Sequence, residues 1–167
     1  MRFAVAAALL AVAALLQSVL GPSLPLVRGR PDFVLVVVVA WAMLRGSIEG
    51  AAMGFLGGLL LDSVTYTPFG INTALFGLIG YATGLPEVSA YRGNLPYFLG
   101  ITVVATLVYH TLYFLSLQAL GNNMPPLVET YATAMPAAIL NAILVPATFI
   151  ACRRLVRALA GWTQLRL

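Results

Sequence analysis

Long apolar runs, separated by short polar breaks, dominate this chain of 167 residues. Charged residues make up 8% of the sequence, whereas a soluble domain uses about 25% to cover its surface. So few charges cannot cover a surface that faces water, but apolar side chains can face lipid without cost. The sequence therefore predicts an all-α integral membrane protein, because helices satisfy their backbone hydrogen bonds internally.

The apolar runs predict about six transmembrane helices in a single polytopic membrane domain covering residues 1–167. A span needs roughly 20 residues, so the chain has room for little else. Between the fourth and fifth spans, Pro86 to Pro96 is expected to form a polar loop. The expected spans are residues 3–20, 33–44, 48–64, 69–85, 97–120 and 127–152.

Two of these spans have a second interpretation. Only Arg45 to Glu49 separates the second run from the third, so the two runs form either a tight hairpin or one long bent helix. Gly46 weakens a helix at that point, which favours the hairpin. The first run also resembles a signal peptide. Its length of 18 residues and the poor small-residue cleavage site at Gln17 to Leu20 favour a retained helix.

The placement of arginine predicts the orientation. The chain has nine arginines and no lysine. With six spans and the N-terminus inside, only Arg28 and Arg30 lie outside, which satisfies the positive-inside rule and makes both termini cytoplasmic. The tail at 153–162 is expected either to lie along the inner surface as a short basic amphipathic helix or only to fix the topology. The basic excess therefore does not indicate nucleic acid. The inner arginines would be Arg2, Arg45, Arg92, Arg153, Arg154, Arg157 and Arg166.

Glycine spacing is the clearest pattern inside the predicted helices. Glycines recur at every fourth residue in the third span and at every seventh residue in the fourth. Such stripes allow helix backbones to approach closely in a membrane. We therefore expect the third and fourth spans to pack on each other, with contact to a partner helix as the alternative. The residues are Gly46, Gly50, Gly54 and Gly58, followed by Gly70, Gly77 and Gly84, with Gly80 beside them.

Two aspartates are expected to lie in a polar cluster on the outer side. Asp32 stands at the start of the second span, where a carboxylate can cap a helix. Asp62 ends the third span, where a bare carboxylate is costly and usually has a partner. That partner could be Ser63, Thr65 or Asn72. The predicted outer polar cluster consists of Arg28, Arg30, Asp32, Asp62 and Asn72.

Signs of catalysis are missing from the sequence. His110, mid-span near the depth of Asn141, is interpreted as a buried, hydrogen-bonded histidine, because an ion site would need more carboxylates at that depth. The single cysteine, Cys152, excludes an internal disulfide and a multi-cysteine metal site. We therefore expect no catalytic residue, no metal and no cofactor. Pro136 and Pro146 are expected to kink the last span.

Several short motifs follow one another in residues 28–92. Arg30-Pro31-Asp32 comes first, followed by Gly54–Asp62, Pro68–Asn72 and Gly77–Tyr81. In order and spacing this series resembles the family of the rod-shape-determining protein MreD. The family motif maps onto Pro31, Asp32, Gly54, Gly58, Asp62, Gly70 and Tyr81.

The resemblance implies a small multi-pass scaffold of the bacterial inner membrane that serves lateral peptidoglycan synthesis. Members associate with MreC and through it connect MreB filaments to RodA and a class B penicillin-binding protein. The implied fold resembles the substrate-binding membrane subunits of energy-coupling-factor transporters. That likeness supplies the alternative function, a vitamin-binding transporter subunit that docks through small residues such as Ala4, Ala8 and Ala11. Capture of MreC or of ATPase subunits would distinguish the two functions.

Overall fold

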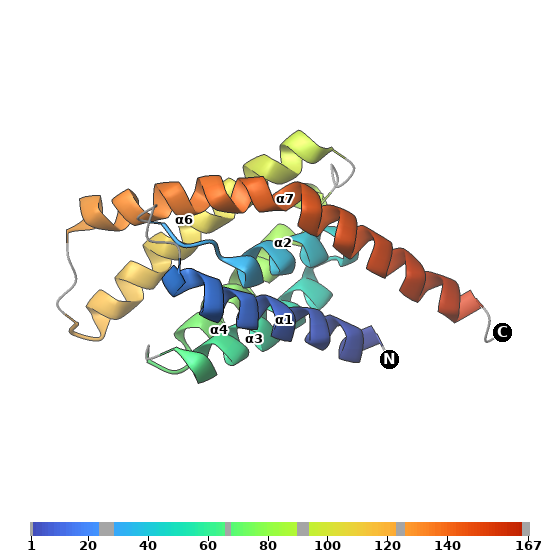
Figure 1. The fold of residues 1–167 in the computed structure, drawn as a ribbon, viewed down its shortest axis with the longest axis horizontal. Coiled ribbons are helices and arrows are strands. Elements are labelled where there is room, and N and C mark those ends of the chain that lie inside the picture. The colour runs from blue at the N-terminus through green and yellow to red at the C-terminus, as the bar shows by residue number, and fades with distance from the viewer. Residues whose placement is uncertain (1, 24–28, 66–67, 90–93, 123–125, 165–167) are drawn as a thin grey trace.

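A computed structural model describes residues 2–23, 29–65, 68–89, 94–122 and 126–164 (Figure 1). These residues form seven α-helices and no strand. Figure 1 shows the helices as an elongated bundle with both ends of the chain toward the same end. The helices are α1 (Arg2–Ser23), α2 (Phe33–Arg45), α3 (Ser47–Val64), α4 (Ile71–Thr83), α5 (Pro86–Ser89), α6 (Leu95–Ala119) and α7 (Leu127–Gln164).

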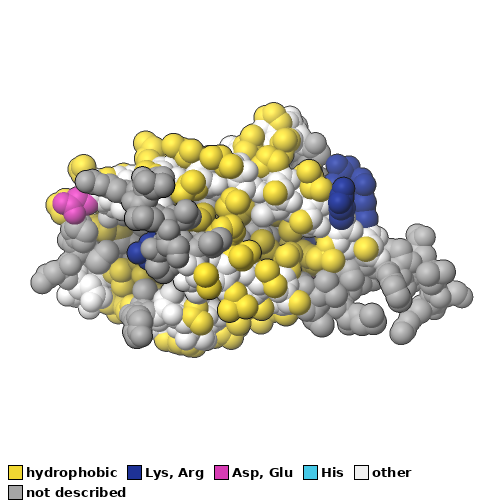
Figure 2. All heavy atoms as spheres, viewed as in Figure 1, with side chains coloured by type: hydrophobic (Ala, Val, Ile, Leu, Met, Phe, Trp, Pro, Cys, Tyr) yellow, Lys and Arg dark blue, Asp and Glu magenta, His cyan; other side chains and the backbone are white. Residues whose placement is uncertain are grey.

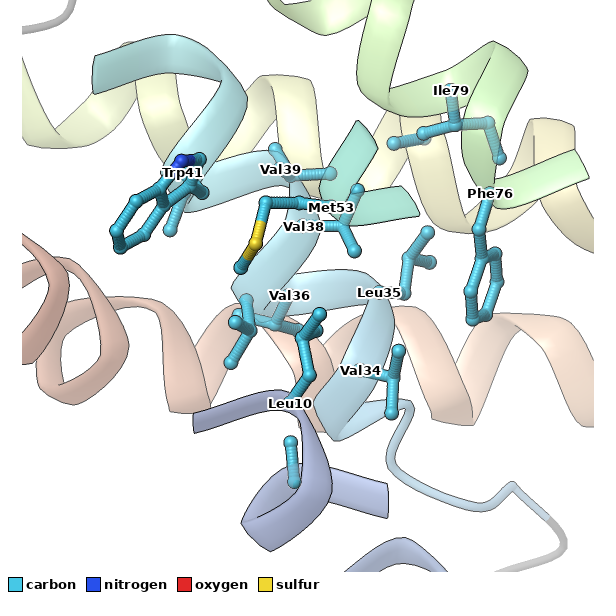
Figure 3. Close-up of a cluster of buried hydrophobic side chains, with 14 of the residues drawn as sticks. Leu10, Val34, Leu35, Val36, Val38, Val39, Trp41, Met53, Phe76 and Ile79 are labelled. Carbon is cyan, nitrogen blue, oxygen red and sulfur yellow. The ribbon is translucent and has the colours of Figure 1, made fainter. Parts of the chain in front are cut away.

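Helix α2 lies at the centre of the bundle. Every residue from Val34 to Met43 is buried, and the helix contacts α1, α3, α4, α6 and α7. Every residue of α2 before Arg45 is apolar, so other helices can cover it on all sides. Figure 3 shows its valines and Leu35 among Leu10 of α1, Met53 of α3 and Phe76 of α4. The other helices are therefore arranged around α2.

Helix length and surface character both match a membrane environment. Figure 2 shows hydrophobic side chains over most of the visible face. Among the described residues, three helices are long and apolar enough to cross a membrane: Ser47–Val64, Leu95–Ala119 and Leu127–Ala158. The apolar helices Phe33–Arg45 and Ile71–Thr83 have 13 residues each and are about 20 Å long, shorter than the roughly 30 Å of hydrocarbon. The count of six spans therefore remains a prediction.

The second and third apolar runs form two separate helices, so the alternative of one bent helix is wrong. Gly46 ends α2 with a φ of 95°, a conformation that favours glycine. The two helices are antiparallel, because the backbone at Gly50 lies against Ala42 and the backbone at Gly57 lies against Val34. An ion pair of 2.7 Å between Arg45 and Glu49 closes the turn, and this hydrogen bond raises the pKa of the Arg45 guanidinium.

The glycines of α3 face α4. A Cβ atom added at Gly50, Gly54 or Gly58 would lie within 3 Å of backbone atoms of α4. Only glycine leaves room for such an approach. The backbone atoms contacted belong to Gly80, Phe76 and the pair Asn72 and Thr73, respectively.

On α4 the contact face differs from the predicted seven-residue repeat. Gly80 and Gly84 lie against Gly50 and Gly46, whereas a Cβ at Gly77 would make only ordinary contacts of 3.9 Å. Gly70 precedes the helix with a φ of 101°, and a Cβ there would meet nothing within 4 Å. The internal contact of α4 with α3 therefore repeats every fourth residue, through the backbone of Phe76, and the seven-residue repeat does not describe it.

Two further boundaries differ from the sequence prediction. The short helix α5 lies within the stretch expected to be a polar loop. Helix α7 continues without a break through the basic tail, so the tail does not form a separate surface helix. Its residues Leu155 and Val156 pack against the hydrophobic core, which explains the continuation. Pro136 and Pro146 lie inside α7, which changes direction along its length in Figure 1.

Candidate functional site

A side chain of α1 caps the start of α2. The first backbone N–H groups of a helix have no partner within the helix, and in lipid no water replaces it. The backbone N–H of Val34 donates to Gln17 Oε1 at 3.2 Å, and Gln17 Nε2 donates to Asp32 Oδ1 at 3.5 Å. The Asp32 side chain makes no capping hydrogen bond. The sequence interpretation of Asp32 as the cap is therefore wrong in this respect, because Gln17 takes that role.

Asn141 of α7 joins Asp32 to α6. The Asp32 backbone N–H donates to Asn141 Oδ1 at 2.8 Å, and Asn141 Nδ2 donates to Asp32 Oδ2 at 3.4 Å. The same amide nitrogen donates to Thr106 Oγ1 of α6 at 3.0 Å. All three side chains are buried. One amide with donor and acceptor groups thus holds together the start of α2, α6 and α7.

His110 lies beside this group on α6. Its Nδ1 is 2.9 Å from the carbonyl oxygen of Thr106, one turn earlier. A carbonyl only accepts, so Nδ1 carries a hydrogen in this contact. The histidine is half-buried and lies within electrostatic range of the Asp32 carboxylate. His110 thus has the structural hydrogen bond expected of a histidine inside a helix bundle.

Asp62 of α3 caps the start of α4. Its Oδ2 accepts from the backbone N–H groups of Gly70 and Thr73, both at 3.0 Å, and from Thr73 Oγ1 at 2.6 Å. Its Oδ1 accepts from the backbone N–H of Asn72 at 3.2 Å. Among the partners expected from sequence, Asn72 thus contributes through its backbone. Ser63 and Thr65 donate to carbonyl oxygens of their own helix, those of Leu59 and Leu61.

Tyr109 of α6 joins α6 to the start of α4, which Asp62 caps. Its hydroxyl donates to the side-chain oxygen of Asn72 at 2.7 Å, and its ring lies 4.9 Å from the Phe76 ring centroid. Both Asp32 and Asp62 lie within electrostatic range of its hydroxyl. We call the combined group the polar layer. It comprises Gln17, Asp32, Asp62, Asn72, Thr73, Thr106, Tyr109, His110 and Asn141.

Of the two arginines of the predicted outer cluster, Arg30 is exposed and makes none of these contacts. Arg28 lies outside the described residues. Within the described part of the chain, the ion pair is the one between Arg45 and Glu49. The aspartates are therefore stabilised by hydrogen bonds from neutral donors. Over the same residues, every buried side-chain nitrogen and oxygen has a partner, and no group of three acidic, histidine or cysteine side chains could hold a metal.

Two members of the polar layer, Asp32 and Asn141, lie far from the arginine-bearing ends of their helices. Asp32 is 13 positions before Arg45 and Asn141 is 12 positions before Arg153. At 1.5 Å per residue, both lie about 18–20 Å along the helix from those arginines, a distance shorter than the roughly 30 Å of a hydrocarbon layer. Polar groups within a membrane need internal partners and commonly mark a functional site.

Sequence reasoning misses three members of the polar layer. In the sequence Gln17 stands out only as part of a poor cleavage site, although a polar amide within an apolar run is itself a signal of a buried partner. Thr73 and Tyr109 carry no such signal, because both residue types are ordinary in membrane helices. The geometry as a whole holds helix ends together and leaves no buried polar group of the described residues without a partner.

Comparison with known proteins gives one match. The family model described as "rod shape-determining protein MreD" matches residues 1–158. Neither the curated proteins nor the solved structures gave a match, so the likeness to energy-coupling-factor subunits remains a prediction. MreD proteins are membrane proteins that act as structural components in the determination of cell shape. Since the match covers most of its length, the chain belongs to the MreD family of rod shape-determining proteins.

Proposed function

We propose that the chain is a non-catalytic scaffold of the cell-elongation machinery, which binds MreC directly. Through MreC it would help to couple MreB filaments to RodA and a class B penicillin-binding protein during lateral peptidoglycan synthesis. The observation that carries the proposal is the family match over residues 1–158, because the family acts in rod shape determination. The partners follow from the family resemblance of the sequence.

The site geometry supports a structural role. Asp62 has four hydrogen-bond donors and Asn141 bridges three elements, so the polar groups are used to hold helices in register. A carboxylate acting as a general acid or base would need access to a substrate proton. Asp62 and Asp32 are only 4% and 7% exposed. A scaffold needs this kind of fixed arrangement of helix faces.

We also propose that the chain is a multi-pass protein of the inner membrane with both termini in the cytoplasm. Four arginines support one common cytoplasmic end, since α2 and α7 run in parallel from the Asp32–Asn141 contact toward that end. The positive-inside rule assigns such an end to the cytoplasm. These arginines are Arg45, Arg153, Arg154 and Arg157.

Quantitative copurification tests the scaffold proposal. The chain carries a C-terminal tag, is expressed from its own locus and is captured from membranes in mild detergent. We expect MreC, RodA and the penicillin-binding protein to be enriched over a control capture of an unrelated polytopic protein with the same tag. Depletion of MreC should remove RodA from the capture, because the coupling runs through MreC. Capture of ATPase subunits without MreC would contradict the scaffold and indicate a transporter.

A further inference from the structure

From Ile139 to Arg157, α7 has two distinct faces. One face packs inward, with Phe149 and Cys152 buried and Leu155 and Val156 against the core. At 100° per residue, the opposite face begins with three exposed isoleucines and ends with three exposed arginines. These are Ile139, Ile143 and Ile150, followed by Arg153, Arg154 and Arg157. Figure 2 shows the basic cluster toward the C-terminal part of the bundle, next to a hydrophobic surface.

The three arginines have no acidic partner in the described part of the chain. The ion pair found there joins Arg45 and Glu49. Glu129 stands at the other end of α7, the two aspartates are buried in the polar layer, and Glu87 of α5 forms no ion pair within 4.0 Å among the described residues. The Arg153 guanidinium lies 5.9 Å from the centroid of the Phe149 ring, which holds it against the helix surface. The three guanidinium groups therefore form an exposed positive patch that an anion outside the described residues can bind.

The length of this face fits one leaflet of a bilayer. Arg153 follows Ile143 by ten positions, or about 15 Å, which is half of the roughly 30 Å hydrocarbon thickness. An acyl chain lying along the isoleucines would place its phosphate beside the guanidinium groups. Arginine binds phosphate through two parallel hydrogen bonds, and basic groups next to a membrane attract anionic lipid. A free phosphate would use only the arginines, and an acidic protein segment would have no use for lipid-facing isoleucines beside them.

We propose that this face of α7 binds an anionic phospholipid, with the acyl chain on Ile143 and Ile150 and the phosphate on Arg153, Arg154 and Arg157. The lipid belongs to the leaflet at the C-terminal end of α7. Its binding does not depend on MreC, because every residue of the site lies on α7.

Native mass spectrometry of the purified full chain tests the site. The protein is held in neutral detergent with equal amounts of phosphatidylglycerol and phosphatidylcholine that have identical acyl chains. We expect wild type to retain phosphatidylglycerol in clear excess and the R153Q/R154Q/R157Q variant to lose that excess. The R153K/R154K/R157K variant keeps the charge but not the paired hydrogen bonds, so it should be intermediate. Arg30→Gln removes an exposed arginine elsewhere and should leave the excess unchanged.

Three outcomes would overturn the proposal. Equal retention of both lipids by wild type would exclude an anionic lipid site and leave an acidic protein segment as the occupant of the patch. Displacement of phosphatidylglycerol by inorganic phosphate would indicate a site for free phosphate. An unchanged excess in both triple variants, with thermal unfolding in detergent as in wild type, would place the lipid elsewhere. The lysine variant keeps the test valid if the glutamine variant fails to fold.

Discussion

The Asp62 carboxylate accepts hydrogen bonds from four donors, all of which belong to the start of α4. Three are backbone N–H groups, those of Gly70, Asn72 and Thr73, and the fourth is the Thr73 hydroxyl. In water such N–H groups would be hydrated, but within a membrane an unpaired one costs several kcal/mol. The carboxylate therefore replaces water, and its use here is local hydrogen bonding without a cationic partner among the described residues.

Substitution of Asp62 separates hydrogen bonding from charge pairing. Asp62→Ala leaves four donors unpaired and should destabilise the protein by about 3 kcal/mol or more. Asp62→Asn keeps one acceptor oxygen, which can serve the three donors at Oδ2, and should cost only about 1–2 kcal/mol. Thermal unfolding of purified protein in detergent measures both changes.

Ser63→Ala is the matched control for this pair, because Ser63 is exposed and its hydroxyl donates to a carbonyl of its own helix. It should unfold as wild type does. An Asp62→Asn variant as unstable as Asp62→Ala would show that the charge itself is required and would argue for a cation outside the described residues.

The sequence predicts that some residues of the polar layer have buried partners, but it does not predict this for others. A carboxylate inside an apolar run is costly wherever it lies, so the sequence alone indicates that Asp62 has a partner. It does not indicate which partners, because three of the four bonds come from backbone groups whose position depends on where α4 begins. Gln17 is hidden for a similar reason, since its acceptor role depends on the approach of α2 to α1.

At the scale of the helix, the glycine stripe of α3 and the Asp62 cap together hold α3 against α4. Gly50, Gly54, Gly58 and Asp62 follow one another at every fourth residue, so they lie on one side of α3. The glycines bring the backbones of α3 and α4 close together. Only at that separation can the short side chain of Asp62 reach the N–H groups of Asn72 and Thr73.

Small substitutions in the stripe should therefore destabilise the protein more than their size suggests. Gly54→Ala places a methyl group against the backbone of Phe76, which cannot move aside as a side chain would. We expect a loss of about 1–3 kcal/mol, and a similar loss for Gly58→Ala. The facing glycine Gly77, with ordinary contacts, and Gly100, with open space, provide matched controls.

Gly77→Ala and Gly100→Ala should unfold at or slightly above the wild-type temperature, because alanine favours a helix over glycine. The comparison uses thermal unfolding in one detergent for all four variants. If Gly54→Ala were as stable as Gly100→Ala, the close approach of α3 and α4 would be wrong.

Helix-scale prediction from sequence succeeds on α3 and fails on α4 for a physical reason. On α3 the contact is made by glycines, which a sequence displays. On α4 part of the contact is made by the backbone of Phe76, whose side chain points into the core, and no sequence pattern shows a backbone contact of this kind. In the repeat, Gly70 is therefore a turn residue, Gly77 is an ordinary helix position, and Gly84 contacts the backbone at Gly46.

Across the whole molecule, the ends of helices are harder to predict than their presence. The apolar runs locate α1, α2, α3, α4, α6 and α7, because hydropathy reports burial in protein or lipid alike. It cannot report where a helix stops once charges appear. Helix α7 continues past Arg153 and Arg154 because its inner face, with Leu155 and Val156, still has a core to pack against.

The positions of the loops lead to a prediction of topology. Gly46 and Gly84 are in contact, so the turn after α2 and the end of α4 lie at the same end of the bundle. From there α6 extends over 25 residues, about 37 Å, to the opposite end of the bundle. Helix α7 returns antiparallel beside it, because Phe98, Thr106 and Thr111 of α6 contact Phe149, Asn141 and Tyr131 of α7, respectively.

Reporter fusions after Asn94 and at the C-terminus should therefore both report a cytoplasmic location, and a fusion near Asn123 should report the opposite side. The arginines at the C-terminal end of α7 predict which side is cytoplasmic. Alkaline phosphatase and a fluorescent protein, fused at the same three positions, give complementary signals, so a failure of expression cannot be confused with a location. If the fusions after Asn94 and at the C-terminus reported opposite sides, α6 and α7 would not cross the membrane as a hairpin. That result would also contradict the proposed cytoplasmic location of both termini.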